Sequence, residues 1–173
     1  MDFFFSLIVF MPMYVSLFWM VTLLMTRGAG NKAKQFLGIF MLVATLLYLS
    51  HSVYFSHQYQ LYVYFDSVYV LAMLSVYPFY YGYLKKLTVD YRFNPAFLVC
   101  LVPAVLISVS VAILYGFMDD GVDFVQKFHY AEAELPDNNR LYQAQKILIV
   151  LSKLIFFVQI VWFLSMGLKL IRK

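Results

Sequence analysis

Residues 95–117 decide the fold class, because they run without a single charged side chain: PAFLVCLVPAVLISVSVAILYGF. About 20 apolar residues, at 1.5 Å per residue, cross the ~30 Å hydrocarbon core of a bilayer. Inside lipid, a backbone satisfies its polar groups only as a helix or as a closed barrel. This stretch lacks the period-two alternation that a barrel strand needs. We therefore expect residues 95–117 to form a transmembrane helix.

Four further stretches of similar length and polarity occur along the chain. They are residues 3–25, 36–56, 61–84 and 147–168. The connectors between them are too short to form a separate soluble domain. We predict an all-α integral membrane bundle of five transmembrane helices, with residues 1–173 forming one multi-pass domain.

The overall composition agrees with a membrane protein. Hydrophobic residues make up 64% of the chain and charged residues 13%, and the mean hydropathy is +0.78. A soluble domain of this size could not solvate such a surface. Cys100 is the only cysteine and lies within a predicted span, so disulfides within the chain are excluded and a packing role is expected.

Basic residues gather in alternate connectors and near the C-terminus. They are Arg27, Lys32, Lys34, Lys85, Lys86, Arg92, Lys169, Arg172 and Lys173. The remaining long connector is mostly acidic and holds Asp119, Asp120, Asp123, Glu132, Glu134 and Asp137. Lys and Arg near span ends favour the cytoplasmic side. We therefore predict an N-terminus outside and a C-terminus in the cytoplasm, in a bacterial inner membrane, and attribute the net charge of +4 to topology.

Three ionisable residues lie inside predicted spans at similar depth from the outer side: His51, Asp66 and Lys153. An unpaired charge at the bilayer centre costs about 2.5–3.5 kcal/mol on insertion scales. Residues 61–84 are less apolar than residues 147–168, so Asp66 makes its span marginal on its own. We therefore predict that Asp66 faces the bundle interior and is neutralised by Lys153, with His51 nearby.

Helical spacing places several polar-tipped aromatic residues on the same face as Asp66. This face consists of Tyr62, Asp66, Tyr69, Met73, Tyr77 and Tyr80, and Tyr48 accompanies His51 on the preceding span. One interpretation is an outward-facing pocket for a small ligand, formed by Asp66, Lys153, His51, Tyr69 and Tyr48. The other is a buried Asp66–Lys153 pair that only holds the bundle together.

Motifs for enzymes and metal sites are missing from the sequence. It contains no Gly-x-Ser-x-Gly elbow, no His-Glu-x-x-His pair and no phosphate-binding glycine loop. His51 and His57 are six residues apart and do not share a helix face. We expect no enzyme activity, no cofactor and no metal. Residues 118–146 hold a short amphipathic segment that suggests either a lid over the outer mouth or a solvated connector.

Three segments resemble a known family. Residues 31–38 read NKAKQFLG, residues 74–88 read LSVYPFYYGYLKKLT, and residues 93–96 read FNPA. Together they look like the membrane-embedded N-terminal region of AraC-type transcriptional regulators of Bacteroidetes-like bacteria, over most of residues 27–170. In that family several helices precede a cytoplasmic DNA-binding domain, so the resemblance implies a sensory or anchoring role. No residue here corresponds to the DNA-binding domain, and no nucleic-acid contact is expected from this chain.

Two classes of function follow from these observations. The first is a sensory or anchoring membrane module, with the bilayer, a small extracytoplasmic ligand and a second copy of the chain (a homodimer) as expected partners. The second is a stand-alone small membrane protein that acts as a transporter subunit or an assembly partner. Inverted repeats are typical of transporters, and five spans do not divide into equal halves, which favours the first class.

Overall fold

The computed structural model describes residues 3–25, 32–88, 96–130 and 139–172, and these residues form helices without a strand. The helices are α1 (Phe3–Met25), α2 (Lys32–Phe55), α3 (Tyr59–Thr88), α4 (Ala96–Val99), α5 (Val102–Phe117), α6 (Gly121–Phe124), the π-helix η1 (Val125–His129) and α7 (Arg140–Ile171). Five helical segments are long and apolar enough to cross a membrane. The prediction of an all-α protein with five such helices is therefore confirmed.

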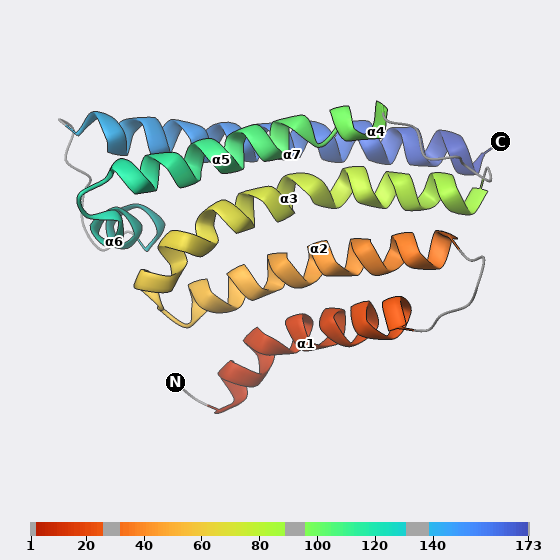
Figure 1. The fold of residues 1–173 in the computed structure, drawn as a ribbon, viewed down its shortest axis with the longest axis horizontal. Helices are drawn as coiled ribbons and strands as arrows, with labels where there is room; N and C mark the ends of the chain where they lie inside the picture. Colours follow the sequence, from red (N-terminus) through yellow and green to blue (C-terminus); the bar gives the residue numbers. More distant parts are fainter. Residues whose placement is uncertain (1–2, 26–31, 89–95, 131–138, 173) are drawn as a thin grey trace.

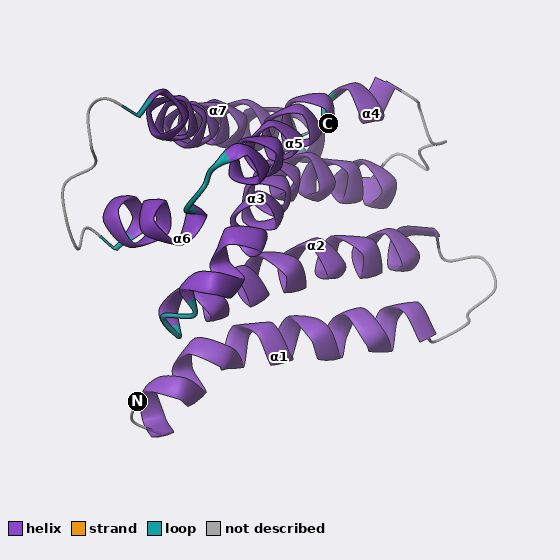
Figure 2. Cartoon of the chain, turned by 60° about the vertical axis from the view of Figure 1, so that its left-hand side comes forward, coloured by secondary structure: helices purple, strands orange, loops and turns teal. Residues whose placement is uncertain are grey.

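The long helices run side by side in the order α1, α2, α3, and then α5 and α7 together (Figures 1 and 2). α1 packs on α2, α2 packs on α3, and α3 packs on both α5 and α7. Of the apolar windows, that of α3 has the largest buried share and that of α1 the smallest. The buried polar residues of α3, Asp66 and Ser75, therefore lie in the interior of the bundle.

The fourth predicted span is interrupted rather than continuous. α4 ends at Val99 and α5 begins at Val102, with a turn at Cys100 and Leu101 between them. Pro103 lies in the first turn of α5, where its missing N–H removes no hydrogen bond. In a continuous helix its ring would clash with the carbonyl of Val99, which explains the break.

Small residues and hydroxyl groups join neighbouring helices, as is common in membrane bundles. A Cβ atom at Gly38 would come within 2.6 Å of the Leu24 side chain, so α2 approaches α1 closely at this glycine. Between α5 and α3, the Ser108 hydroxyl donates to the carbonyl of Ser67 at 2.8 Å. These contacts hold α2 against α1 by close packing and α5 against α3 by a hydrogen bond.

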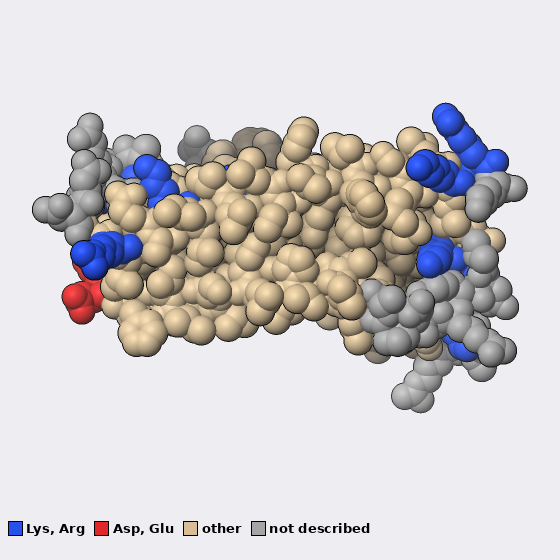
Figure 3. Space-filling model, turned by 90° about the horizontal axis from the view of Figure 1, so that it is seen from above, with Lys and Arg blue, Asp and Glu red and all other residues tan. Residues whose placement is uncertain are grey.

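Charged side chains are concentrated at the two ends of the bundle (Figure 3). One end carries Lys32, Lys34, Lys85, Lys86, Lys169 and Arg172. The opposite end carries Asp119, Asp120 and Asp123 together with Lys127 and Arg140. This separation matches the pattern on which the orientation was predicted, and the orientation itself stays a prediction. Arg27, Arg92, Glu132, Glu134, Asp137 and Lys173 lie outside the described residues.

Residues 118–130 form a folded cap at the acidic end, and the interpretation of this part as a solvated connector is wrong. Phe124 and Val125 have exposed fractions of 0% because they pack into the hydrophobic core. The Asp120 side chain accepts a hydrogen bond from the Asp123 N–H and begins α6. We call α6 and η1 together the cap (Figure 2).

Candidate functional site

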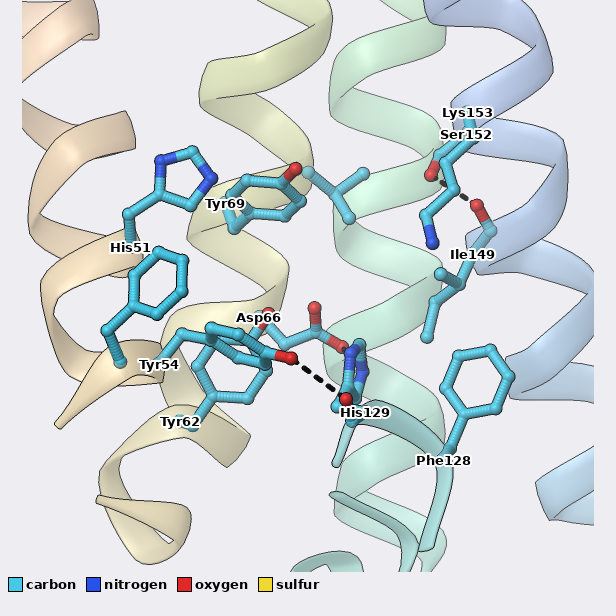
Figure 4. Close-up of a pocket in the computed structure, with 12 residues that line it drawn as sticks. His51, Tyr54, Tyr62, Asp66, Tyr69, Phe128, His129, Ile149, Ser152 and Lys153 are labelled. Carbon is cyan, nitrogen blue, oxygen red and sulfur yellow. Dashed lines mark hydrogen bonds and ion pairs between the residues drawn. The ribbon is translucent and has the colours of Figure 1, made fainter. Parts of the chain in front are cut away.

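A polar pocket lies at the acidic end of the bundle, between α2, α3, α7 and the cap (Figure 4). Its volume is about 260 Å³. The lining residues are His51, Tyr54, Phe55, Tyr62, Asp66, Tyr69, Val70, Phe128, His129, Ile149, Ser152 and Lys153. Ligand pockets typically enclose about 300–1,000 Å³, so this pocket lies just below that range and has room only for a small molecule.

Asp66 is the central polar residue of the pocket, and its exposed fraction is 1%. The Tyr115 hydroxyl of α5 donates a hydrogen bond to its Oδ2 atom at 2.8 Å. The Nε2 atom of His129 lies 3.3 Å from the same oxygen but is not aligned for a hydrogen bond. The contact with His129 is therefore electrostatic, and it is an ion pair when the imidazole is protonated. The prediction that Asp66 faces the bundle interior is confirmed.

His129 belongs to the site although sequence reasoning did not identify it. It ends the π-helix η1, whose wider turn directs its ring toward Asp66. The Tyr54 hydroxyl donates to the backbone carbonyl of His129 at 2.9 Å (Figure 4). The imidazole also packs edge-on against Tyr62 and Phe128, with ring centroids 5.1 Å away in both cases. A histidine within an aromatic run was the only sequence signal for this position.

Lys153 lines the pocket but does not neutralise Asp66, so the predicted ion pair is wrong. Among the described residues, the basic side chain within ion-pair distance of Asp66 is His129. The pair does not form because the two side chains lie on different sides of the pocket. The Asp66 Oδ2 atom faces α5 and the cap, whereas Lys153 extends from an exposed position on α7 (Figure 4). Neighbouring Ser152 is buried and donates to the carbonyl of Ile149 at 2.7 Å.

His51 and Tyr69 meet in the pocket, whereas Tyr48 lies outside it. The His51 and Tyr69 ring centroids are 5.2 Å apart, and both side chains line the pocket. Tyr48 is 38% exposed and borders grooves shared with α1 instead. Its ring reaches His51 at 6.4 Å, so it supports the wall from behind. Tyr48 is therefore corrected from a pocket residue to a neighbour of one.

Only the first half of the predicted face on α3 contributes to the pocket. Tyr62, Asp66 and Tyr69 line it. Further along the helix, Tyr77 packs on Phe156 of α7 with ring centroids 5.5 Å apart. The later part of the face is therefore a helix–helix contact.

Gln145 of α7 is an unusual neighbour of the site. Its exposed fraction is 0%, and neither polar atom of its amide has a hydrogen-bond partner within the described part of the chain. It approaches the Tyr115 hydroxyl without reaching hydrogen-bond geometry. An unsatisfied buried amide destabilises the local structure by about 1–3 kcal/mol, so this region is not packed for stability alone.

Polar contacts of Asp123, within the cap and with α7, help to hold the cap in place. The Nζ atom of Lys127 lies 2.8 Å from Asp123 Oδ1, and the Tyr142 hydroxyl of α7 donates to Asp123 Oδ2 at 3.0 Å. The hydrogen bond from Lys127 lowers the pKa of the Asp123 carboxyl, and the Tyr142 hydroxyl acts in the same direction. Tyr130 adds a further contact, because its hydroxyl donates to the carbonyl of Tyr54.

Metal ligands do not gather in the described ranges, where no three His, Cys, Asp or Glu side chains come together. Comparisons of this chain with family models, with curated proteins and with solved structures find no match. The site is therefore interpreted from its own chemistry. It contains a buried carboxylate with one hydrogen-bond donor and one electrostatic neighbour at the same oxygen, walls of aromatic rings, and an exposed lysine.

Proposed function

We propose that this chain is a sensory membrane module of a bacterial inner membrane, in which the polar pocket receives a small ligand from the extracytoplasmic side. The observation that carries this proposal is the position of Asp66. Through Tyr115 and His129 it connects α3, α5 and the cap at one buried carboxylate. A molecule that enters the pocket contacts this connection directly.

The length of α3 allows a change at the pocket to be transmitted to the other end of the bundle. This helix runs from the pocket at Tyr59–Asp66 to Lys85 and Lys86 at the basic end. A ligand shifts an equilibrium between two packings only if it binds them with different affinity. A carboxylate shared by three elements provides such a difference, because its contacts change when the elements move.

The resemblance to the membrane region of AraC-type regulators supports the same role, with an effector on the cytoplasmic side. A transporter subunit or assembly partner is the alternative. The helix break at Cys100 and Leu101 gives it little support, because the break lies toward the basic end and the polar pocket at the acidic end. In transporters, broken helices form the binding site itself.

Distance measurements across the basic end test the proposal without a known ligand. Spin labels are attached at Lys32→Cys on α2 and Lys169→Cys on α7, with Cys100→Ser removing the native thiol, and the protein is placed in lipid nanodiscs. A sensory module responds to Asp66→Asn and His129→Gln with a changed distance distribution between the labels. Tyr64→Phe is the matched control, because Tyr64 lies on the same part of α3 but is exposed. Identical distributions in all variants would indicate an anchor and overturn the sensory role.

A further inference from the structure

The two charged side chains of the pocket face the same space without pairing. Asp66 lines it from α3 and Lys153 lines it from α7. Within the described part of the chain, no ion pair joins them at 4.0 Å or less, and Lys153 makes no other salt bridge. In Figure 4 the lysine side chain extends from α7 toward the pocket, with its nitrogen on the pocket side. One wall therefore presents a negative group and another presents a positive group.

Neighbouring side chains of the described residues contact only one of the two carboxylate oxygens of Asp66. Both the Tyr115 hydroxyl and the His129 ring approach the Oδ2 atom. The Oδ1 atom receives no hydrogen bond from any described residue and is directed away from His129 in Figure 4. A carboxylate can accept about four hydrogen bonds through its two oxygens, so Oδ1 is free to accept from a ligand.

Aromatic rings surround the same region. Tyr54, Tyr62, Tyr69 and Phe128 line the pocket near Asp66, and the Tyr54 and Tyr62 ring centroids are 5.3 Å apart. The faces of aromatic rings attract cations, and this attraction grows when water is excluded. An ammonium group is thus favoured next to Asp66 Oδ1.

Lys153 determines which charge a ligand must carry at the other wall of the pocket. A ligand that is only cationic would meet the lysine ammonium as a like charge, and a ligand that is only anionic would meet Asp66. The rest of the lining combines apolar side chains, such as Phe55, Val70 and Ile149, with the polar side chains of His51 and Ser152. Only a molecule that carries both charges around an apolar body satisfies all of these surfaces.

We propose that the pocket binds a small zwitterion with an apolar body, of the chemical class of an apolar α-amino acid. Its ammonium group is held by Asp66 Oδ1 and the tyrosine rings, and its carboxylate by Lys153. The volume of about 260 Å³ limits the ligand to a small molecule. This inference rests on the proposed sensory function and specifies the ligand of that same pocket.

Calorimetric binding in lipid nanodiscs tests the ligand class. The probes are L-valine, L-leucine and L-phenylalanine, each compared with the amine that lacks its carboxylate and with the acid that lacks its ammonium group. At least one zwitterion is expected to bind, and its matched amine and acid to bind at least about tenfold more weakly, since each loses one charge-assisted contact. Absence of binding by all three amino acids, or equal binding of the matched amine or acid, would overturn the proposal.

Variants test the two assigned contacts separately. Asp66→Asn and Lys153→Met are each expected to weaken binding of the zwitterion by about tenfold or more. Asp119→Asn and Lys146→Met are the matched controls, because both residues are exposed and lie outside the pocket lining. Lys153→Glu provides a second test if the Asp66 variant folds poorly, because Lys153 is exposed and its replacement should be tolerated. This reversal of charge should shift the binding preference from the zwitterion toward the matched amine. Unchanged preference in Lys153→Glu would contradict the assignment.

Failure of the ligand proposal can be distinguished from failure of the sensory proposal. Binding of the zwitterion without a changed distance between the labels at Lys32 and Lys169 would refute the sensory role and leave the ligand assignment in place. A changed distance in the Asp66 variant, together with no zwitterion binding, would refute the ligand class alone.

Discussion

Asp66 shows how a single carboxylate is retained inside an apolar bundle. Moving an ion out of water costs several kcal/mol even after relaxation, and the cost is offset only where donors approach it closely. The Tyr115 hydroxyl at 2.8 Å is the aligned donor, and the His129 ring adds an electrostatic contact. Tyr115 and His129 therefore stabilise the buried carboxylate of Asp66.

Removal of the Tyr115 hydroxyl measures the first of these contacts. Tyr115→Phe keeps the ring but removes the hydrogen bond to a charged group, so we expect a loss of about 1.5–3 kcal/mol in the free energy of unfolding. Unfolding in mixed detergent micelles provides the measurement. Tyr64→Phe serves as the control, because its hydroxyl is exposed and its removal should have little effect. Equal effects of the two changes would refute the assigned role of Tyr115.

Double-mutant cycles distinguish His129 from Lys153 as the electrostatic neighbour of Asp66. Residues in contact show coupling of about 0.5–3 kcal/mol, whereas separate residues are additive within about 0.3–0.5 kcal/mol. We expect coupling between Asp66→Asn and His129→Gln, and additivity between Asp66→Asn and Lys153→Met. Unfolding free energies of the single and double variants give both values. Coupling in the Lys153 cycle alone would restore the ion pair expected from the sequence.

At the scale of elements, the cap completes the pocket, because Phe128 and His129 form part of its wall. Besides the buried apolar residues of the cap, Asp123 contributes to its attachment, because it accepts from the Tyr142 hydroxyl of α7 and, within the cap, from Lys127. Asp123→Asn should raise amide hydrogen exchange in residues 121–129 while exchange in α5 stays unchanged. Asp119→Asn is the control, because Asp119 is exposed and makes none of these hydrogen bonds. Unaltered exchange in the cap would show that its apolar residues suffice.

The pH dependence of the cap follows from the same carboxyl. Its pKa is lowered in the folded protein, mainly by the hydrogen bond from Lys127. A lowered folded-state pKa gives a contribution that is present above the ordinary carboxyl pKa and is lost as the pH falls through the lowered value. Relative to the intrinsic exchange rate at each pH, exchange in residues 121–129 should therefore rise only in acid, and this rise should be weaker in Asp123→Asn. A rise near neutral pH would point to a different group.

The sequence predicts the long helices well because length and hydropathy determine them locally. Their ends depend on single side chains: α7 begins at Arg140 because Asn139 accepts from the N–H groups of Leu141 and Tyr142, ahead of the apolar stretch. The pocket is predictable in part, since helical spacing places Tyr62, Asp66 and Tyr69 together. His129 is not predictable in this way, because its direction depends on a π-turn in a segment distant in sequence.

For the whole molecule, the exposed surface is dominated by large apolar side chains along every long helix. Soluble proteins rarely expose continuous apolar surface of this extent. A bilayer would cover this surface, and the charged ends of Figure 3 would then lie in the two aqueous phases. The polar pocket lies at the end opposite to most of the described basic residues.

The orientation of this bundle is the prediction on which the ligand's access depends. Lys and Arg near span ends are retained in the cytoplasm, so the end with Lys85 and Lys86 should be cytoplasmic and the cap extracytoplasmic. Alkaline phosphatase, which folds only outside the cytoplasm, should be active when fused after Lys127 and inactive when fused after Lys86. A fluorescent reporter that folds only in the cytoplasm is the control and should give the opposite pattern at both positions. A reversed result would place the pocket on the cytoplasmic side, where no extracytoplasmic ligand could enter it.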